Sequence, residues 1–130
     1  MNNTAEVKII AIDTLAEECV TLLIHGITIE CFANYRPYTV AIGETHLIEI
    51  TIDYSEPLQI EKSAEPNAFP EKIGNGYGYY LHGVLDGEIF RSFTDFSDED
   101  IHYDYPELVG KPVKIKADRI NVNFLQLLKL

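Results

Sequence analysis

The sequence CVTLLIHGITIEC, residues 19–31, predicts a β-hairpin and decides the fold class. With a two-residue turn at His25-Gly26, every second residue of one strand meets an apolar residue of the other. The pairs on that face are Val20–Cys31, Leu22–Ile29 and Ile24–Ile27. Because a slip of one residue turns a whole face away from the core, we expect this register to be fixed.

A second register of the same hairpin has a three-residue loop ending at Gly26, which opposes Cys19 to Cys31. It also sets Val20 against Glu30, which mixes apolar and charged groups on one face, so we prefer the first register. There Cys31 points inward and Cys19 outward, and an intramolecular disulfide is disfavoured. We expect structural thiols.

Apolar alternation continues along the chain. Residues 7–12 are apolar on both faces, which predicts a central strand that is either covered on both sides or crosses a barrel interior. Residues 46–54 alternate strictly. A turn at Asp86-Gly87 predicts a second hairpin, in which His82 opposes Arg91.

The last third of the chain adds one helix and one long strand region. Ser97 precedes three acidic residues and is expected to cap a short helix near 97–105 that ends before Pro106. The apolar phase of residues 112–124 changes at Asp118-Arg119, which predicts a β-bulge or a sharp bend.

These elements predict a mainly β protein, with residues 1–130 forming a single domain. We expect a small curved antiparallel barrel, with a long mobile loop near 61–78 where prolines and glycines replace the alternation. The strand pattern resembles the outline of an OB-fold, although the helix falls later than its usual place between the third and fourth strands. This resemblance concerns architecture alone and implies no function.

The chain carries 21 acidic and 10 basic residues, a formal net charge of -11. A negative field of this size opposes nucleic-acid backbones and anionic membranes. Single-stranded nucleic-acid binding by an OB-like domain is therefore an alternative that requires a local basic cluster on one face. The candidates are Lys8, Arg36, Arg91, Lys111, Lys114, Lys116 and Arg119.

Targeting signals and catalytic motifs are missing from the sequence. The N-terminal residues lack a secretory pattern and no segment has the length of a membrane span, so we expect a cytoplasmic protein. No two of the four histidines have the spacing of zinc ligands. Gly74–Gly78 is followed by a predicted strand, whereas a phosphate-binding loop is followed by a helix. The acidic segment 95–104 matches no calcium loop. We expect no cofactor and no metal, and the pattern favours a protein without enzymatic activity.

Tyrosines and acidic residues gather in two places, which is typical of a protein-recognition surface because the ring packs while the hydroxyl keeps a hydrogen bond. The candidate partner-binding residues are Tyr77, Tyr79, Asp98, Asp100, Tyr103 and Tyr105. At least one of Tyr79 and Tyr80 should face inward, since neighbours on a strand alternate.

The leading functional hypothesis is a non-enzymatic protein-interaction module whose acidic surface binds another protein, for example a basic one, as an inhibitor or immunity-type protein does. The alternative is a small-ligand or carbohydrate-binding barrel, or an unrecognised enzyme, that uses His82, Arg91 and Tyr80. The apolar C-terminal segment 124–130 either packs over the barrel or forms a homo-oligomer contact.

Overall fold

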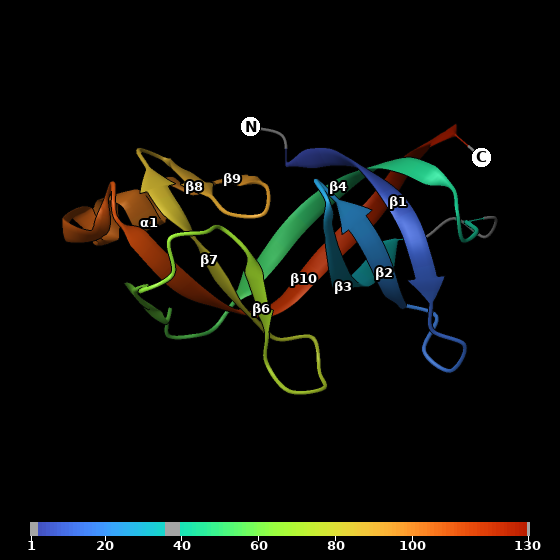
Figure 1. Cartoon of the computed structure of the whole chain (residues 1–130), viewed down its shortest axis with the longest axis horizontal. Helices are drawn as coiled ribbons and strands as arrows, with labels where there is room; N and C mark the ends of the chain where they lie inside the picture. Colours follow the sequence, from blue (N-terminus) through green and yellow to red (C-terminus); the bar gives the residue numbers. More distant parts are fainter. Residues whose placement is uncertain (1–2, 36–39, 130) are drawn as a thin grey trace. The chain divides into compact units, whose positions relative to one another are not determined.

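The structure, a computed structural model, describes residues 3–35 and 40–129. The chain divides into two compact units, one made of residues 54–118 and the other of the residues up to 53 together with those from 119 onward (Figure 1). The predicted basic residue Arg36 lies outside the described residues. Whether the two units act as the single predicted domain stays a prediction.

The discontinuous unit is a closed five-stranded barrel. Its strands are β1 (Thr4–Ile12), β2 (Cys19–Ile24), β3 (Ile27–Tyr35), β4 (Thr45–Tyr54) and the second half of β10 (Pro112–Lys129). The order is β3-β2-β1-β4-β10, and a parallel pairing of β10 with β3 closes the ring. The other pairings are antiparallel, so the predicted small barrel is confirmed, and the order is compatible with an OB-like outline.

The β2–β3 hairpin has the preferred register. Val20 pairs with Cys31 and Ile24 with Ile27, which leaves His25 and Gly26 as the turn. Both turn residues adopt positive φ angles, as a two-residue hairpin of this type requires. Cys31 is fully buried, and neither cysteine forms a disulfide.

The prediction that β1 is covered on both faces is wrong. Ala5, Val7 and Ile9 are buried, whereas the residues between them are exposed, and Ile10 keeps 41% of its surface. The strand has neighbours on both edges, but a barrel covers only the inner face of each strand. Because Ile10 on the outer face is apolar, the sequence had the pattern of a strand that is covered on both faces.

A buried acid and histidine lie at the start of β4. The Glu44 Oε1 atom accepts a hydrogen bond from the Ala41 backbone N–H at 2.6 Å and lies 3.2 Å from Nε2 of His46. Both residues are buried. The Ala41 N–H first, and then the His46 ring, hold the pKa of the Glu44 carboxyl below its ordinary value of 4.5.

We expect Glu44→Gln to flatten the acid side of the stability profile. A carboxyl whose pKa is lower in the folded state stabilises the fold above the unfolded-state pKa, and this stabilisation is lost as the pH falls through the folded-state value. The free energy of unfolding, measured by urea titration from neutral pH to about pH 3, should fall more steeply for wild type than for the variant. Parallel profiles would contradict this role of Glu44.

The contiguous unit, residues 54–118, is built around β7 (Tyr79–Asp86) and the first half of β10. Its shorter strands are β5 (Ile60–Lys62), β6 (Pro70–Lys72), β8 (Ile89–Arg91) and β9 (Asp95–Ser97). β10 pairs with β5 on one edge and β7 on the other, and β7 pairs with β6 and β8. β9 pairs with β8 and ends the sheet.

The segment 61–78, predicted to be a loop, contains β6 and the end of β5. Such short strands add backbone hydrogen bonds to a neighbour and need no apolar alternation, which is why the sequence pattern did not reveal them. The mobility predicted for this segment is untested.

The predicted β7–β8 register is wrong by two residues. Arg91 pairs with Val84 and not with His82, because the turn falls on Gly87-Glu88 and not on Asp86-Gly87. Gly87 is the turn residue with a positive φ of 60°. Both turns use the same glycine, so the sequence did not distinguish them.

The helix α1 (Glu99–Asp104) ends before Pro106, as predicted, and the 3-10 helix η1 (Pro106–Leu108) follows. The N-cap of α1 is Asp98 and not the predicted Ser97, because the Asp98 side chain accepts a hydrogen bond from the Ile101 N–H. None of the helices in the described ranges is long and apolar enough to span a membrane.

The predicted change of apolar phase in β10 is confirmed. Ala117 and Ile120 are both buried, and of the two residues between them Asp118 is exposed and Arg119 is partly buried. The register shifts of β10 lie further along the strand, so no bulge marks this point. The phase changes where the strand leaves one unit and enters the other, since each unit has its own core.

Candidate functional site

Three strands of the contiguous unit place a row of polar side chains on the face away from the core. Lys114 on β10 pairs with Glu61 on β5 and with His82 on β7. Val113 and Ile115, its neighbours on β10, are fully buried on the opposite face. Directly opposed residues of paired strands share a face, so Glu61, Lys114 and His82 lie side by side.

His82 is the centre of a hydrogen-bonded network, which we call the histidine network, formed with Ser63 and Glu71. Its Nδ1 atom lies 2.8 Å from Oγ of Ser63, and its Nε2 atom lies 2.7 Å from Oε1 of Glu71. The His82 side chain is only 4% exposed, whereas the Glu71 side chain is 50% exposed. The network therefore connects a buried imidazole to the surface.

The hydrogen-bond partners of His82 assign its tautomer. The Glu71 carboxylate only accepts hydrogen bonds, so Nε2 of the neutral ring carries the proton. Nδ1 is then an acceptor, and the Ser63 hydroxyl donates to it. The hydroxyl oxygen itself accepts the Glu65 backbone N–H at 3.0 Å, which leaves its own proton directed at the ring.

Packing holds the His82 ring in place. The Phe69 ring stacks on it with centroids 4.4 Å apart and planes 7° apart. The His82 backbone N–H donates to the Phe69 carbonyl, and its carbonyl accepts the Ser92 hydroxyl. The stacked Phe69 ring and the hydrogen bonds at the two ring nitrogens hold the imidazole in one orientation toward Ser63.

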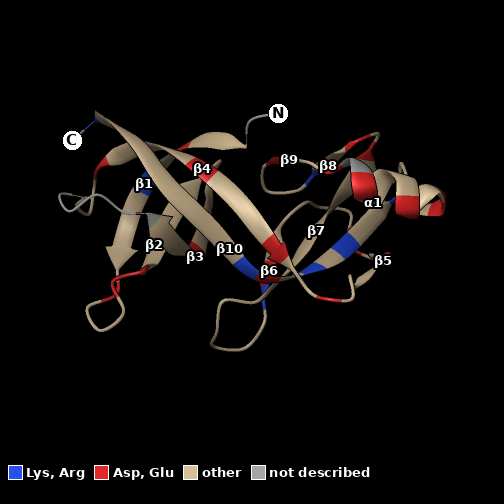
Figure 2. Ribbon diagram, turned by 180° about the vertical axis from the view of Figure 1, so that it is seen from behind, with Lys and Arg blue, Asp and Glu red and all other residues tan. Residues whose placement is uncertain are grey.

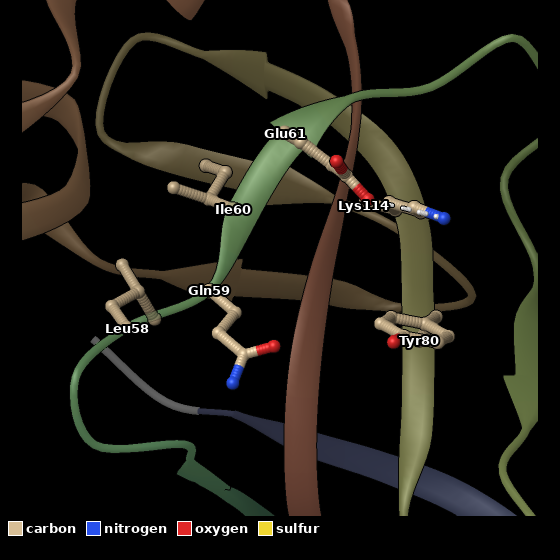
Figure 3. A pocket seen from close by; sticks show the side chains of 6 residues that line it. All are labelled: Leu58, Gln59, Ile60, Glu61, Tyr80 and Lys114. Carbon is tan, nitrogen blue, oxygen red and sulfur yellow. Dashed lines mark ion pairs between the residues drawn. The ribbon is translucent and has the colours of Figure 1, made fainter.

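Two open hollows adjoin Lys114. One, of about 310 Å³, is bordered by Tyr80 and β5, and the other, of about 360 Å³, is bordered by the histidine network. Figure 3 shows Lys114 and Glu61 pointing toward one another, with the Tyr80 ring beneath; the Lys114 ammonium is 3.2 Å from the Glu61 carboxylate and 4.7 Å from the ring centroid. The hydrogen bond that the Lys114 ammonium donates to the Glu61 carboxylate is the main cause that raises the Lys114 pKa.

The structure does not join His82 and Arg91 in one site. His82 and Tyr80 border the hollows beside Lys114. Arg91 instead forms ion pairs with Asp86 and Asp95 at 2.7 and 2.8 Å, as the corrected register of β8 requires. Of the predicted ligand-binding residues, His82 and Tyr80 therefore border the hollows beside Lys114, and Arg91 is not among their lining residues.

The sequence did not identify Ser63 and Glu71 as candidate site residues. Both lie in the segment interpreted as a loop, eight positions apart, and no motif has that spacing. The short strands β5 and β6 bring them to the same imidazole. Only the register in which β5 pairs with β10 and β6 pairs with β7 would have identified these two residues.

A second hollow region, which we call the acidic pocket, lies beside α1 and has a volume of about 380 Å³. Its carboxylates belong to Glu56, Asp98, Asp100 and Asp104, and its other lining residues are Tyr54, Ser55, Pro57, Leu58 and Ile101. Figure 2 shows the acidic residues on α1 and the adjoining segment. Burial, and then the Asp98 charge, raise the pKa of Tyr54 above its ordinary value, so its phenol stays protonated.

The predicted partner-binding residues fall in different surroundings. Asp98 and Asp100 line the acidic pocket, and Tyr103 on α1 is 67% exposed. Tyr77 and Tyr105 are partly buried. Tyr79 is 4% exposed and is not a surface residue, because it faces the core while Tyr80 faces outward, as alternation requires.

Basic side chains form ion pairs at several of the positions named for nucleic-acid binding. Arg91, Lys114 and Arg119 each lie within 4.0 Å of a carboxylate. Pairing reduces the positive potential that a phosphate backbone would meet. In the described residues, no three side chains of the metal-ligating types are grouped to hold a metal ion.

Comparisons with known proteins give a family and no relatives of established function. No curated protein matches the chain. No solved structure matches it either. A family model described as "Uncharacterised conserved protein UCP019853" matches residues 1–125, so the chain belongs to that family.

Proposed function

We propose that this protein is an interaction module that binds a basic protein through the acidic pocket. The observation that carries the proposal is a hollow with four carboxylates at its border in a chain of net charge -11. An inhibitor or immunity-type protein that blocks a cationic target is the specific form we favour.

The lining of the acidic pocket suits an arginine or lysine side chain. Pro57, Leu58 and Ile101 offer apolar contact to the methylene groups of such a side chain. The exposed carboxylates of Asp100 and Asp104 offer charge-assisted hydrogen bonds to its cationic head. The long-range negative field would also accelerate encounter with a basic partner.

We expect the double variant Asp100→Asn, Asp104→Asn to lose capture of the partner. Association rate constants for the captured protein, measured at about 50 mM salt, should fall roughly threefold to tenfold, because charges at the edge of an interface act mainly on the encounter rate. The N-cap Asp98 is unchanged, so α1 keeps its capping hydrogen bond. The measurement is affinity capture with mass spectrometry, followed by binding kinetics at low and high salt.

The matched control is the double variant Glu6→Gln, Glu18→Gln, which removes the same two charges from exposed positions in the barrel unit. A partner held by the wild type and by this control but not by the Asp100/Asp104 variant supports the proposal. An equal loss of partner binding in both variants would mean that net charge, and not the acidic pocket, causes the effect. Binding that is indifferent to salt would refute the electrostatic interpretation.

The hollows beside Lys114 favour a second candidate, a small-ligand or carbohydrate site. Tyr80 offers an aromatic face there, and Lys114 and Glu61 offer a hydrogen-bonding pair. Thermal-shift screening of sugars and small anions, repeated with Tyr80→Ala, tests this candidate. A ligand that stabilises the wild type and the variant equally would place the site elsewhere.

The proposal places the protein in the cytoplasm, where free thiols persist. Neither Cys19 nor Cys31 forms a disulfide. Fractionation of cells that express the protein would test the location.

The segment 124–130 is proposed as a self-association contact. Among its described residues, 124–129, the large apolar side chains that are exposed are Leu125 and Leu127, at 53% and 46%. Sedimentation of the wild type and of Leu125→Ser, Leu127→Ser would test it, and a concentration-independent monomer in both would exclude it.

A further inference from the structure

We propose that Ser63 is a nucleophile for acyl transfer, with His82 as its general base and Glu71 as the positioning residue for the imidazole. This site lies apart from the residues of the acidic pocket and does not depend on the binding function proposed above. Its substrate class is a small carboxylic ester that fits the hollow of about 360 Å³ bordered by these three residues.

The hydrogen bonds run in the direction that activates a hydroxyl. Glu71 fixes the proton on Nε2 of His82 at 2.7 Å, which leaves Nδ1 as the acceptor of the Ser63 proton at 2.8 Å. A hydroxyl, an imidazole and a carboxylate in this sequence form the nucleophile, base and orienting group that acyl transfer requires. The two ring nitrogens exchange roles relative to the commonest arrangement of such groups, and the chemistry needs only that one accepts and the other donates.

The imidazole is held more firmly than a surface histidine. Phe69 stacks on the ring and shields it from water, and the side chain is 4% exposed. Ser63, in contrast, is partly exposed and borders the hollow. A buried base behind an accessible hydroxyl is the arrangement in which a substrate reaches the nucleophile and water does not displace the base.

Charged groups of both signs border the same hollow. Lys62 and Lys114 both border it, together with the carboxylates of Glu61, Glu65 and Glu71. Glu61 is paired with Lys114, and Glu71 with His82. An ammonium group near the carbonyl oxygen of a bound ester would stabilise the negative charge that develops there.

Hydrolysis of the ester at Ser63 needs water as its only co-reactant. The Ser63 Oγ atom bonds to the ester carbonyl carbon while its proton moves to Nδ1 of His82. The carbon–oxygen bond to the alcohol then breaks, and the alcohol leaves with that proton. Water cleaves the acyl-serine by the same steps, which returns the proton to Ser63 and releases the carboxylic acid.

The test uses the full chain with two probes, a fluorophosphonate and p-nitrophenyl acetate. Attack of Ser63 on the fluorophosphonate forms an oxygen–phosphorus bond and releases fluoride and the proton as hydrogen fluoride. We expect one adduct per chain by intact mass, located at Ser63 by peptide mapping, and release of p-nitrophenol from the ester. Ser63→Ala should abolish both signals.

Glu71→Ala and its matched control Glu88→Ala, which also removes a carboxylate, separate catalysis from structure. Glu71 is half exposed, so its removal leaves the core intact but frees the imidazole to turn, and we expect labelling at least about tenfold slower at an unchanged melting temperature. Glu88, an exposed acidic residue of the same unit, does not border the hollow, so Glu88→Ala should label as the wild type does. A folded wild type that stays unlabelled, an adduct on another residue, or equal rates in wild type and Glu71→Ala would each overturn the proposal.

Discussion

Replacing Phe124 with alanine is expected to destabilise the barrel unit by about 3–5 kcal/mol, as removal of a buried phenylalanine ring commonly does. Phe124 on β10 is 1% exposed and meets the His46 ring edge to face, with centroids 5.3 Å apart. The change would leave a cavity beside a buried polar ring. Urea unfolding followed by circular dichroism would give the difference in free energy.

Leu125→Ala is the matched control, because it removes an apolar side chain from the next position of the same strand. Leu125 is 53% exposed, and exposed substitutions usually change stability by about 0.5 kcal/mol or less. Similar losses for Phe124→Ala and Leu125→Ala would mean that β10 does not have the inward and outward faces described above.

Gly83→Ala is expected to destabilise the contiguous unit by about 1–3 kcal/mol or more, as overpacking does where backbone must move. A methyl group at this position of β7 would overlap the carbonyl oxygen of Arg91 and would lie 2.9 Å from Cε1 of Phe90. The backbone of β8 would have to shift. Thermal and urea unfolding measure the loss, and hydrogen exchange should show faster opening of the β7–β8 pair.

Gly76→Ala provides the comparison for Gly83→Ala. A methyl group at Gly76 would meet nothing within 4 Å, and the residue does not have the positive φ that favours glycine. Its effect should therefore be near neutral or stabilising, by up to about 1 kcal/mol. If both variants lose the same stability, the close approach of β7 to Arg91 is not the cause.

Local patterns predicted much of the fold. The His25-Gly26 turn fixed the β2–β3 register because only one pairing gave a wholly apolar face. The phase change at Asp118-Arg119 was equally visible, since it alters which residues are apolar. What it meant, a strand passing between two cores, was not visible, because one strand carries no information about its partners.

The candidate site was harder to predict than the fold. His82 drew attention as a histidine on a strand, but its partners Ser63 and Glu71 depend on strand pairings that involve three residues each. Arg91 was assigned to the wrong neighbour by a two-residue shift in one turn. Pairings of backbone alone leave no pattern in the side chains, so contacts that depend on them cannot be derived from alternation.

The discontinuity of the barrel sets an order of events during synthesis of the chain. The unit of residues 54–118 has all its strands available as soon as its own contiguous segment has left the ribosome. The barrel has four strands by then, but its ring lacks the residues after Arg119 that pair with both β3 and β4. The four strands that are translated before the contiguous unit therefore complete their fold after it, and until then two barrel edges are exposed to other chains.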